Sequence, residues 1–333
     1  MSQETSKWLN SNTLIGFTSK RGNAWHYRAS EQGAESNHYP LAVPVADVQR
    51  RLFAWKAEES PITFEVGGKQ YVDPTRKGIV RPDTQALLGV FRSGFQIHDY
   101  DEWLIQQTQN IADSDLDVSS AGLLKGGAVA WVQFELPETM QACGMGFRPF
   151  ITAATSLDGS LASTFLTGSQ IVVCDNTMSA ALADKTHMLK VRHSSKSIGR
   201  LGEVRDALGI VHEVGVDFIA QIEGLAATKV SAKVWGRFLD GLAPAPKDGA
   251  SARAAAMVER KREAMTRLYT SDARVAPWTG TALGVLQAAN TFEQHEAHVR
   301  GISRPERNAL NMVTGAFAKA DQSTLDLLAA AMK

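Results

Sequence analysis

The chain has 333 residues, of which 44% are hydrophobic and 21% charged, and its 35 basic side chains balance 35 acidic ones. This composition is typical of a folded globular protein with one large domain or two smaller ones, and it excludes a disordered chain. Two cysteines without a paired spacing exclude a disulfide scaffold and a zinc ribbon, and zero net charge argues against a generally basic, DNA-coating protein.

The N-terminal residues 1–7 are polar and lack the apolar core of a signal peptide. No stretch approaches the roughly 20 apolar residues that cross a bilayer. We therefore expect a soluble, intracellular protein with no membrane partner.

The first 40 residues mix glycines, polar residues and the aromatic cluster 24–27, which predicts an extended arm or short strands. A short amphipathic helix is expected within 45–58, and a hairpin turns at Gly67-Gly68. A turn at 81–84 and a helix at 100–112 follow.

Strand signals are strongest in the middle of the chain, at 118–124 and 128–136. In the second segment apolar residues alternate with Gln133 and Glu135, which predicts one buried face and one solvated face. A further hairpin, 147–155 with 160–166, is expected to close at Asp158-Gly159 through a type I′ turn.

After a strand that ends at Cys174, Asp175 or Asn176 is a natural N-cap for a helix opening at Thr177-Met178. Helical patterns then dominate, and two prolines and a glycine mark a linker. Segregated strands and helices predict an α+β fold with an antiparallel sheet. The expected helices are 199–208, 214–225, 229–241, 250–269, 280–299 and 305–333, and the expected divisions are an α+β core (1–242), a linker (243–249) and a helical region (250–333).

Common catalytic motifs are absent. The chain has no Gly-rich phosphate loop ending in Gly-Lys-Ser/Thr, no Gly-x-Gly-x-x-Gly and no Gly-x-Ser-x-Gly. An ATP-driven recombinase or helicase is therefore not expected, and no cofactor and no catalytic residue are assigned.

Three smaller features each have a structural and a functional interpretation. His295 and His298 lie three apart, which on a helix can bring two imidazoles to one metal, but the zinc-protease pattern differs and a solvated helix end explains them. Cys174 is either a thiolate at a helix N-terminus or core packing. Trp25-His26 either anchors the arm or contacts a ligand. None of the three features is assigned as a metal site.

A local excess of cations follows the strands. Serine hydroxyls at 194, 195 and 197 lie among these lysine and arginine residues. Hydroxyl groups and cationic side chains are both donors that bind phosphate oxygens. The other interpretation is a solvated surface whose charge is balanced elsewhere. Sheet aromatics such as Trp131 or Phe147 are expected to stack bases beside it. The candidate nucleic-acid-binding residues are Lys185, Lys190, Arg192, His193, Lys196, Arg200 and Trp131.

A second charged stretch, 259–267, mixes both signs. This pattern is typical of an exposed helix face or of a subunit contact.

Several stretches together carry a family resemblance: Ala24-Trp25-His26, 122–131, 171–178, Val191-Arg192-His193-Ser194 and 288–295. They resemble the phage/plasmid-like proteins of unknown function, found on bacteriophages, plasmids and prophage-like islands. The most specific element is the Val-Cys-x-Asn-Thr junction at 173–177 with the later Arg-His pair; Tyr27 departs from the glycine that usually follows Trp-His. The resemblance implies a mobile element, a bacterial or phage-infected cytoplasm and work on DNA.

In outline, a sheet with a β-hairpin, backing helices and a basic segment is also similar to phage single-strand annealing proteins. Those proteins form rings or filaments that hold a strand in a cationic groove without ATP. The first hypothesis is thus an oligomeric protein that binds or anneals single-stranded DNA. The second is an enzyme or ligand binder around Trp25-His26 and His193, and the third is a regulatory or anti-defence protein that contacts a host protein.

Overall fold

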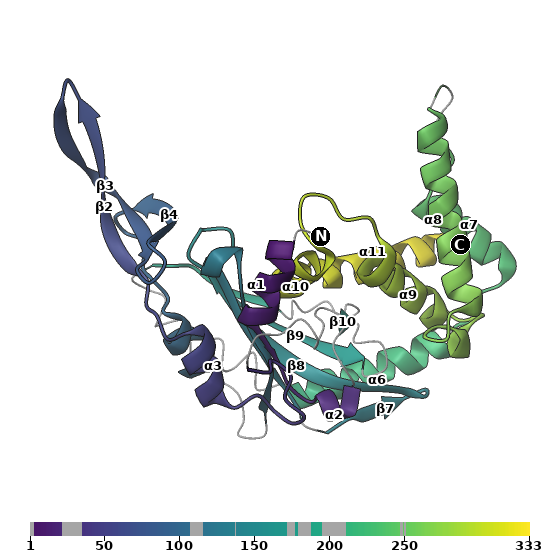
Figure 1. Ribbon diagram of the computed structural model, residues 1–333. Helices are drawn as coiled ribbons and strands as arrows, with labels where there is room; N and C mark the ends of the chain where they lie inside the picture. The colour runs from purple at the N-terminus through teal and green to yellow at the C-terminus, as the bar shows by residue number, and fades with distance from the viewer. Residues whose placement is uncertain are drawn as a thin grey trace.

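Strands occupy the first half of the protein and helices the second, so the α+β expectation is confirmed (Figure 1). The computed structural model describes residues 3–21, 35–106, 116–136, 138–171, 177–178, 188–194, 211–246, 249 and 251–333.

The main sheet contains eight described strands, all paired antiparallel. Their order is β1-β5-β6-β8-β9; β10 and β11 both pair with β9, and β7 pairs with β8. Antiparallel pairing suits this chain because its consecutive strands are joined by short turns. The strands are β1 (Thr13–Ile15), β5 (Asp117–Leu124), β6 (Val129–Glu135), β7 (Met140–Ala142), β8 (Met145–Ser156), β9 (Ser163–Ile171), β10 (Thr177–Met178) and β11 (Met188–Val191).

A separate three-stranded sheet forms an arm that projects from the body (Figure 1). It consists of β2 (Glu58–Val66), β3 (Lys69–Arg81) and β4 (Ala86–Arg92). Gly67 and Gly68 turn the arm with φ of 59° and 73°. Two successive positive φ values are what a two-residue hairpin turn requires, so this prediction is confirmed.

The β8–β9 hairpin also forms, but not through the expected two-residue turn. Six residues, 157–162, connect the strands, and within them only Gly159 has a positive φ, of 76°. The carboxylate of Asp158 accepts hydrogen bonds from the Ser160 amide at 2.8 Å and from Lys125 Nζ at 2.9 Å. A side-chain turn at Asp158 thus replaces the type I′ turn.

For the first 40 residues an extended arm or short strands were expected. Residues 3–12 instead form a helix that packs through Leu9 on the sheet, whereas the short strand Thr13–Ile15 agrees with the expectation. The expected helix at 100–112 is described only as a short π-helix, η2. Likewise Thr177-Met178 is a strand beside β9, so it does not open a helix; Cys174, Asp175 and Asn176 lie outside the described residues. The helical elements before β8 are α1 (Gln3–Asn12), α2 (Thr18–Arg21), α3 (Val45–Leu52), η2 (Asp101–Gln106) and η3 (Lys125–Gly127).

The helices of the second half begin at serine or threonine caps in several places, as at Ser231 and Ser251, whose hydroxyls accept from the backbone amide three residues later. The expected helix at 305–333 is broken at Gly315, which has a φ of 71°. The expected helix at 199–208 lies outside the described residues. The helices are α6 (Val211–Ala227), α7 (Ala232–Leu242), α8 (Ala252–Ser271), η5 (Ala276–Trp278), α9 (Ala282–Thr291), η6 (Phe292–Glu296), α10 (Arg304–Thr314) and α11 (Ala316–Met332).

One hydrophobic cluster spans the predicted linker. It joins Phe238 and Leu239 of α7 to Met265 and Leu268 of α8 and to Leu328 of α11. Helix α7 ends at Leu242 and α8 begins at Ala252, and the cluster contains residues of both helices. Helices on both sides of the expected linker therefore share this cluster.

Both faces of the main sheet are covered. On one face Val132 packs with Leu52 of α3 and Trp103 of η2; on the other Trp131 packs with Leu9 of α1 and Val313 of α10. All seven residues of β6 are buried, which corrects the expectation that Gln133 and Glu135 face solvent. Their alternation with apolar residues reflects a buried polar cluster instead.

That polar cluster contains an ion pair inside the sheet. Arg148 Nε lies 3.0 Å from Glu135 Oε2, with both side chains fully buried. Gln133 Nε2 donates to the other Glu135 oxygen at 3.0 Å, and the Arg148 guanidinium lies 4.9 Å from the centre of the Phe17 ring. Burial is tolerated because each charge has a partner.

Candidate nucleic-acid interface

Strand β11 brings part of the basic segment to the side of β9. Lys190 is paired with Thr164, and Val191 with Ser163. Val191 is only 2% exposed and belongs to the core, whereas Lys190 and Arg192 on either side of it are exposed. The strand alternation therefore directs two cations of the candidate set outward. Lys185, Lys196 and Arg200 lie outside the described residues.

His193 is held differently from its basic neighbours. Its Nδ1 donates to the Gln96 carbonyl at 2.9 Å, and its Nε2 lies 3.2 Å from Thr155 Oγ1. Burial lowers the pKa of His193, so the ring is neutral at pH 7. Because both ring nitrogens have hydrogen-bond partners, His193 anchors the segment. The sequence predicted that His193 would bind nucleic acid, but in this arrangement its ring is not placed to donate to a phosphate.

The anchor continues into a buried hydrogen-bond chain. Thr155 Oγ1 lies 2.8 Å from Ser163 Oγ, which lies 2.5 Å from His98 Nδ1. Because the Gln96 carbonyl can only accept, the neutral His193 ring accepts from Thr155 through Nε2. The donors then run in one direction: His98 Nδ1–H to Ser163, Ser163 to Thr155, and Thr155 to His193.

This direction bears on catalysis. A serine nucleophile needs a histidine nitrogen that accepts its proton, but here the His98 nitrogen next to Ser163 carries the hydrogen. Ser163 is 2% exposed and His98 is 1% exposed. Burial, with a smaller contribution from His193, lowers the pKa of His98 to about 3. The Ser-His pair is thus a structural connection.

Five aromatic rings stack in succession around the same anchor. Phe91 stacks on Phe95 at 3.9 Å between ring centres, Phe95 on His193 at 4.7 Å, His193 on His98 at 3.9 Å, and His98 on Trp103 at 3.6 Å. Trp103 lies in the core. Phe91 and Phe95 are partly exposed, and residues 92–94 between them are exposed. The ring stack therefore runs from the core to the surface.

The aromatic residues expected to stack bases are not at this surface. Trp131 is 2% exposed, and its indole lies where a Cβ at Gly122 would come within 2.2 Å of it. Phe147 is fully buried against Phe218 of α6, with ring centres 4.6 Å apart. Their burial does not agree with a role in base stacking. Phe91 and Phe95 are instead partly exposed rings that lead to His193, and no sequence motif marked them.

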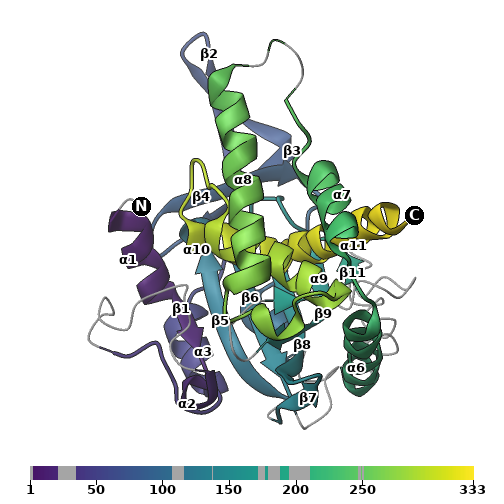
Figure 2. The same ribbon diagram turned by 90° about the vertical axis from the view of Figure 1, so that its right-hand side faces the viewer.

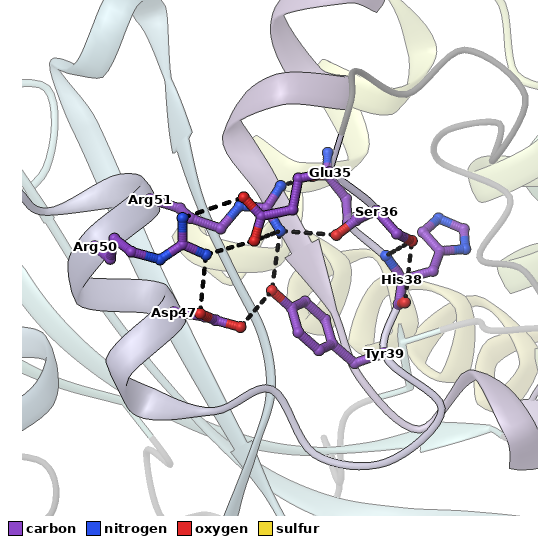
Figure 3. Close-up of polar contacts among 8 residues, drawn as sticks. Glu35, Ser36, His38, Tyr39, Asp47, Arg50 and Arg51 are labelled. Atoms are coloured by element: carbon purple, nitrogen blue, oxygen red, sulfur yellow. Dashed lines mark hydrogen bonds and ion pairs between the residues drawn. The ribbon is translucent and has the colours of Figure 1, made fainter.

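Another pair of cations is neutralised within the fold (Figure 3). Arg50 pairs with Glu35 and, at 3.0 Å, with Asp47, while Arg51 Nη1 donates to the Ser36 carbonyl at 2.7 Å. The Arg50 hydrogen bond is the main cause of the lowered pKa of both Glu35 and Asp47. These arginines fix the segment that follows residues 22–34 to α3 and are not available to phosphates. Trp25 and His26 lie outside the described residues.

Metal binding finds no support in the part of the chain that the structure describes, where no three His, Cys, Asp or Glu side chains group around one point. The π-helix η6 ends at Glu296, before His298. His295 and His298 therefore do not share the helix face on which the sequence would place them. Across the same described ranges, no helix has the length and apolar character needed to span a membrane.

A family model described as a domain of unknown function (DUF932) matches residues 87–315, about two thirds of the chain. The chain belongs to the DUF932 family. The DUF932 match begins within β4 and ends just past α10, so it includes the ring stack and β11 but leaves out most of the projecting arm. Comparison with curated proteins gave no match, and comparison with solved structures gave none either.

Proposed function

We propose that this DUF932 protein binds single-stranded DNA, and anneals complementary strands, without ATP. The observation that carries the proposal is the outward pair Lys190 and Arg192, held at the sheet by the half-buried anchor His193. A fixed backbone at these two positions reduces the conformational freedom that is lost when the cations bind phosphate, which favours binding.

The partly exposed rings Phe91 and Phe95 supply the second component of such a site. Aromatic faces stack on bases of any sequence, whereas cations contact the backbone. Both components meet at His193, which stacks on Phe95 and directly follows Arg192. In this proposal the phosphates lie on Lys190 and Arg192, and the bases stack at the outer end of the ring stack.

The resemblance to phage and plasmid proteins supports a role in recombination or replication of a mobile element, in the cytoplasm of a bacterial host. The neutral net charge supports an oligomer, since acidic surface can be used in subunit contacts.

The experiment measures the fluorescence anisotropy of a labelled oligonucleotide with the full-length protein, without nucleotide. We expect binding at about 50 mM salt, with log affinity falling linearly in log salt. Annealing is followed in the same buffer with complementary strands. Absence of binding at that salt concentration contradicts the proposal. A host protein that co-purifies without nucleic acid would favour the regulatory alternative.

A further inference from the structure

A small cavity lies among the helices of the second half of the chain. Its volume is about 190 Å³, and its lining comes from α7, α8, α9, η6 and α11. The helices α7, α8, α9 and α11 share one hydrophobic cluster, and Figure 2 shows α8 upright beside the other three. Pockets for drug-sized ligands measure about 300–1,000 Å³, so this cavity fits a smaller molecule.

Differences in burial divide the cavity into a floor and a mouth. Asn290 is 3% exposed and Asp321 is 2% exposed, so they form the floor. Lys261 and Glu293 are partly exposed and lie at the mouth. The remaining walls are mainly apolar, with Leu242, Met265, Phe292, Phe317 and Leu327. The cavity therefore has a polar floor, apolar walls and a charged opening.

A carboxylate is held in a defined position at the floor. Asn290 Nδ2 donates to Asp321 Oδ1 at 2.9 Å, and Gln294 Nε2 donates to Asn290 Oδ1 at 2.9 Å. The second bond fixes the orientation of the Asn290 amide, so that its NH₂ group faces Asp321. A carboxylate can accept about four hydrogen bonds, and a buried one is stabilised by donors or by an opposite charge. This end of the cavity suits an ammonium group, which supplies both.

The mouth carries a cation that has no counterion. Lys261 Nζ donates to the Leu242 carbonyl at 3.2 Å, and Lys261 forms no ion pair in the part of the chain that the structure describes. Burial lowers the pKa of Lys261, and the nearby charge of Glu293 opposes this effect. An ammonium has three donors, so two of them remain for a ligand. A carboxylate is the natural partner for these donors.

The signs of these charges disfavour a ligand that carries only one charge. A simple anion would bring its charge close to Glu293 and Asp321, whereas a simple cation would leave Lys261 without a counterion. Glu293 pairs with Arg307 at 2.7 Å and forms no ion pair with Lys261. A molecule with one charge of each sign complements both ends of the cavity.

We propose that this cavity binds a small zwitterion with an apolar side group, which is the chemistry of an apolar α-amino acid. The ammonium lies at Asp321 and the carboxylate at Lys261. The side group packs against Met265 and Phe292. The site is independent of the proposed strand binding, since none of its lining residues belongs to β11 or to the ring stack.

Isothermal titration calorimetry of the full-length protein tests the site, with L-leucine, L-methionine and L-phenylalanine as probes. We expect at least one of them to bind as one molecule per chain with a Kd below about 1 mM. Analogues of that probe then lack one charge each. For leucine, 4-methylpentanoate has no ammonium and 3-methylbutylamine has no carboxylate. Each analogue should bind at least about tenfold more weakly, because it lacks one charged hydrogen bond.

Lys261→Met keeps the apolar stem of the side chain but removes its charge, so it should weaken amino-acid binding at least about tenfold. It should leave the affinity for the amine analogue unchanged, because the amine has no group for Lys261. Asp321→Asn should weaken amino-acid binding by a similar factor. Its urea midpoint is measured alongside, since Asp321 is buried. Arg260→Met is the matched control, because Arg260 is the exposed neighbour of Lys261 and does not line the cavity.

Failure of all three amino acids to bind with a Kd below about 1 mM would overturn the proposal. Equal affinity for the amino acid and for a single-charge analogue would overturn the zwitterion. Equal affinities of Lys261→Met and Arg260→Met for the amino acid would also overturn the site. If Asp321→Asn does not fold, the comparison of Lys261→Met with Arg260→Met decides the question.

Discussion

The imidazole rings of His98 and His193 stack with centres 3.9 Å apart and an interplanar angle of 18°. His98 lies in the loop before η2 and His193 lies two residues after the end of β11, so this contact joins two distant parts of the chain. It positions the exposed cations Lys190 and Arg192 relative to the body.

Acid should weaken the fold through these two histidines. In the unfolded chain an imidazole takes up a proton near pH 6.5, but in the folded chain the pKa of His98 is about 3 and that of His193 is also lowered. Between these values the unfolded chain binds more protons, so the free energy of unfolding decreases as the pH falls. Urea midpoints at about pH 7 and 5.5 measure the change.

His193→Gln should reduce that pH dependence, because it removes one of the two protonation sites. His298→Gln is the control, since His298 is exposed. Equal pH dependence in the unmodified protein and in both variants would contradict a neutral pair with lowered pKa values.

Gly122 is predicted to be irreplaceable because it stands opposite Trp131 in the β5–β6 pairing. A Cβ at position 122 would lie 2.2 Å from the Trp131 ring, so Gly122→Ala should lower the free energy of unfolding by about 1–3 kcal/mol. Gly94→Ala, where a Cβ meets nothing within 4 Å, should have little effect. Urea unfolding of both variants decides the point, and similar midpoints would contradict it.

The buried pair of Glu135 and Arg148 should be costly to break from either side. Glu135→Gln leaves the Arg148 charge without its carboxylate inside the sheet, and we expect a loss of about 3–5 kcal/mol in the free energy of unfolding. Glu296→Gln removes the partner of the 53%-exposed Arg267 and should matter much less. Chemical denaturation compares the two, and equal losses would mean that the buried pair has no special weight.

The outer rings of the stack should contribute to strand binding. Phe91→Leu keeps an apolar side chain but removes the aromatic face, so oligonucleotide affinity should fall by up to about 1–3 kcal/mol for one lost stacked base. The urea midpoint of the variant is measured alongside, so that loss of fold is distinguished from loss of stacking. Unchanged affinity would remove Phe91 from the interface.

The sequence predicted the elements that depend on neighbouring residues, such as hairpin turns and amphipathic helices. The Gly67-Gly68 hairpin and helix α8 follow from turn chemistry and helical periodicity, and both form. The main wrong predictions concern residues whose burial depends on contacts with distant parts of the chain. Gln133 and Glu135 have the alternation of a solvated strand face, yet Arg148 from β8 satisfies Glu135 inside the sheet.

The candidate site was predictable only in part. A charge excess identified Lys190 and Arg192, which the structure places outward, but nothing local distinguished His193, whose partners Gln96 and Thr155 are distant in sequence. Phe91 and Phe95 were missed for the same reason, since the stacking of Phe95 on His193 exists only after β11 pairs with β9.

The most direct measurement of the central claim is the salt dependence of oligonucleotide binding for Lys190→Ala with Arg192→Ala. If each cation holds one phosphate, the slope of log affinity against log salt should decrease in magnitude by about 1.4, at about 0.7 per contact. The exposed pair Lys233→Ala with Arg237→Ala on α7 should keep the slope of the unmodified protein. Identical slopes for all three proteins would contradict a phosphate-binding role for Lys190 and Arg192.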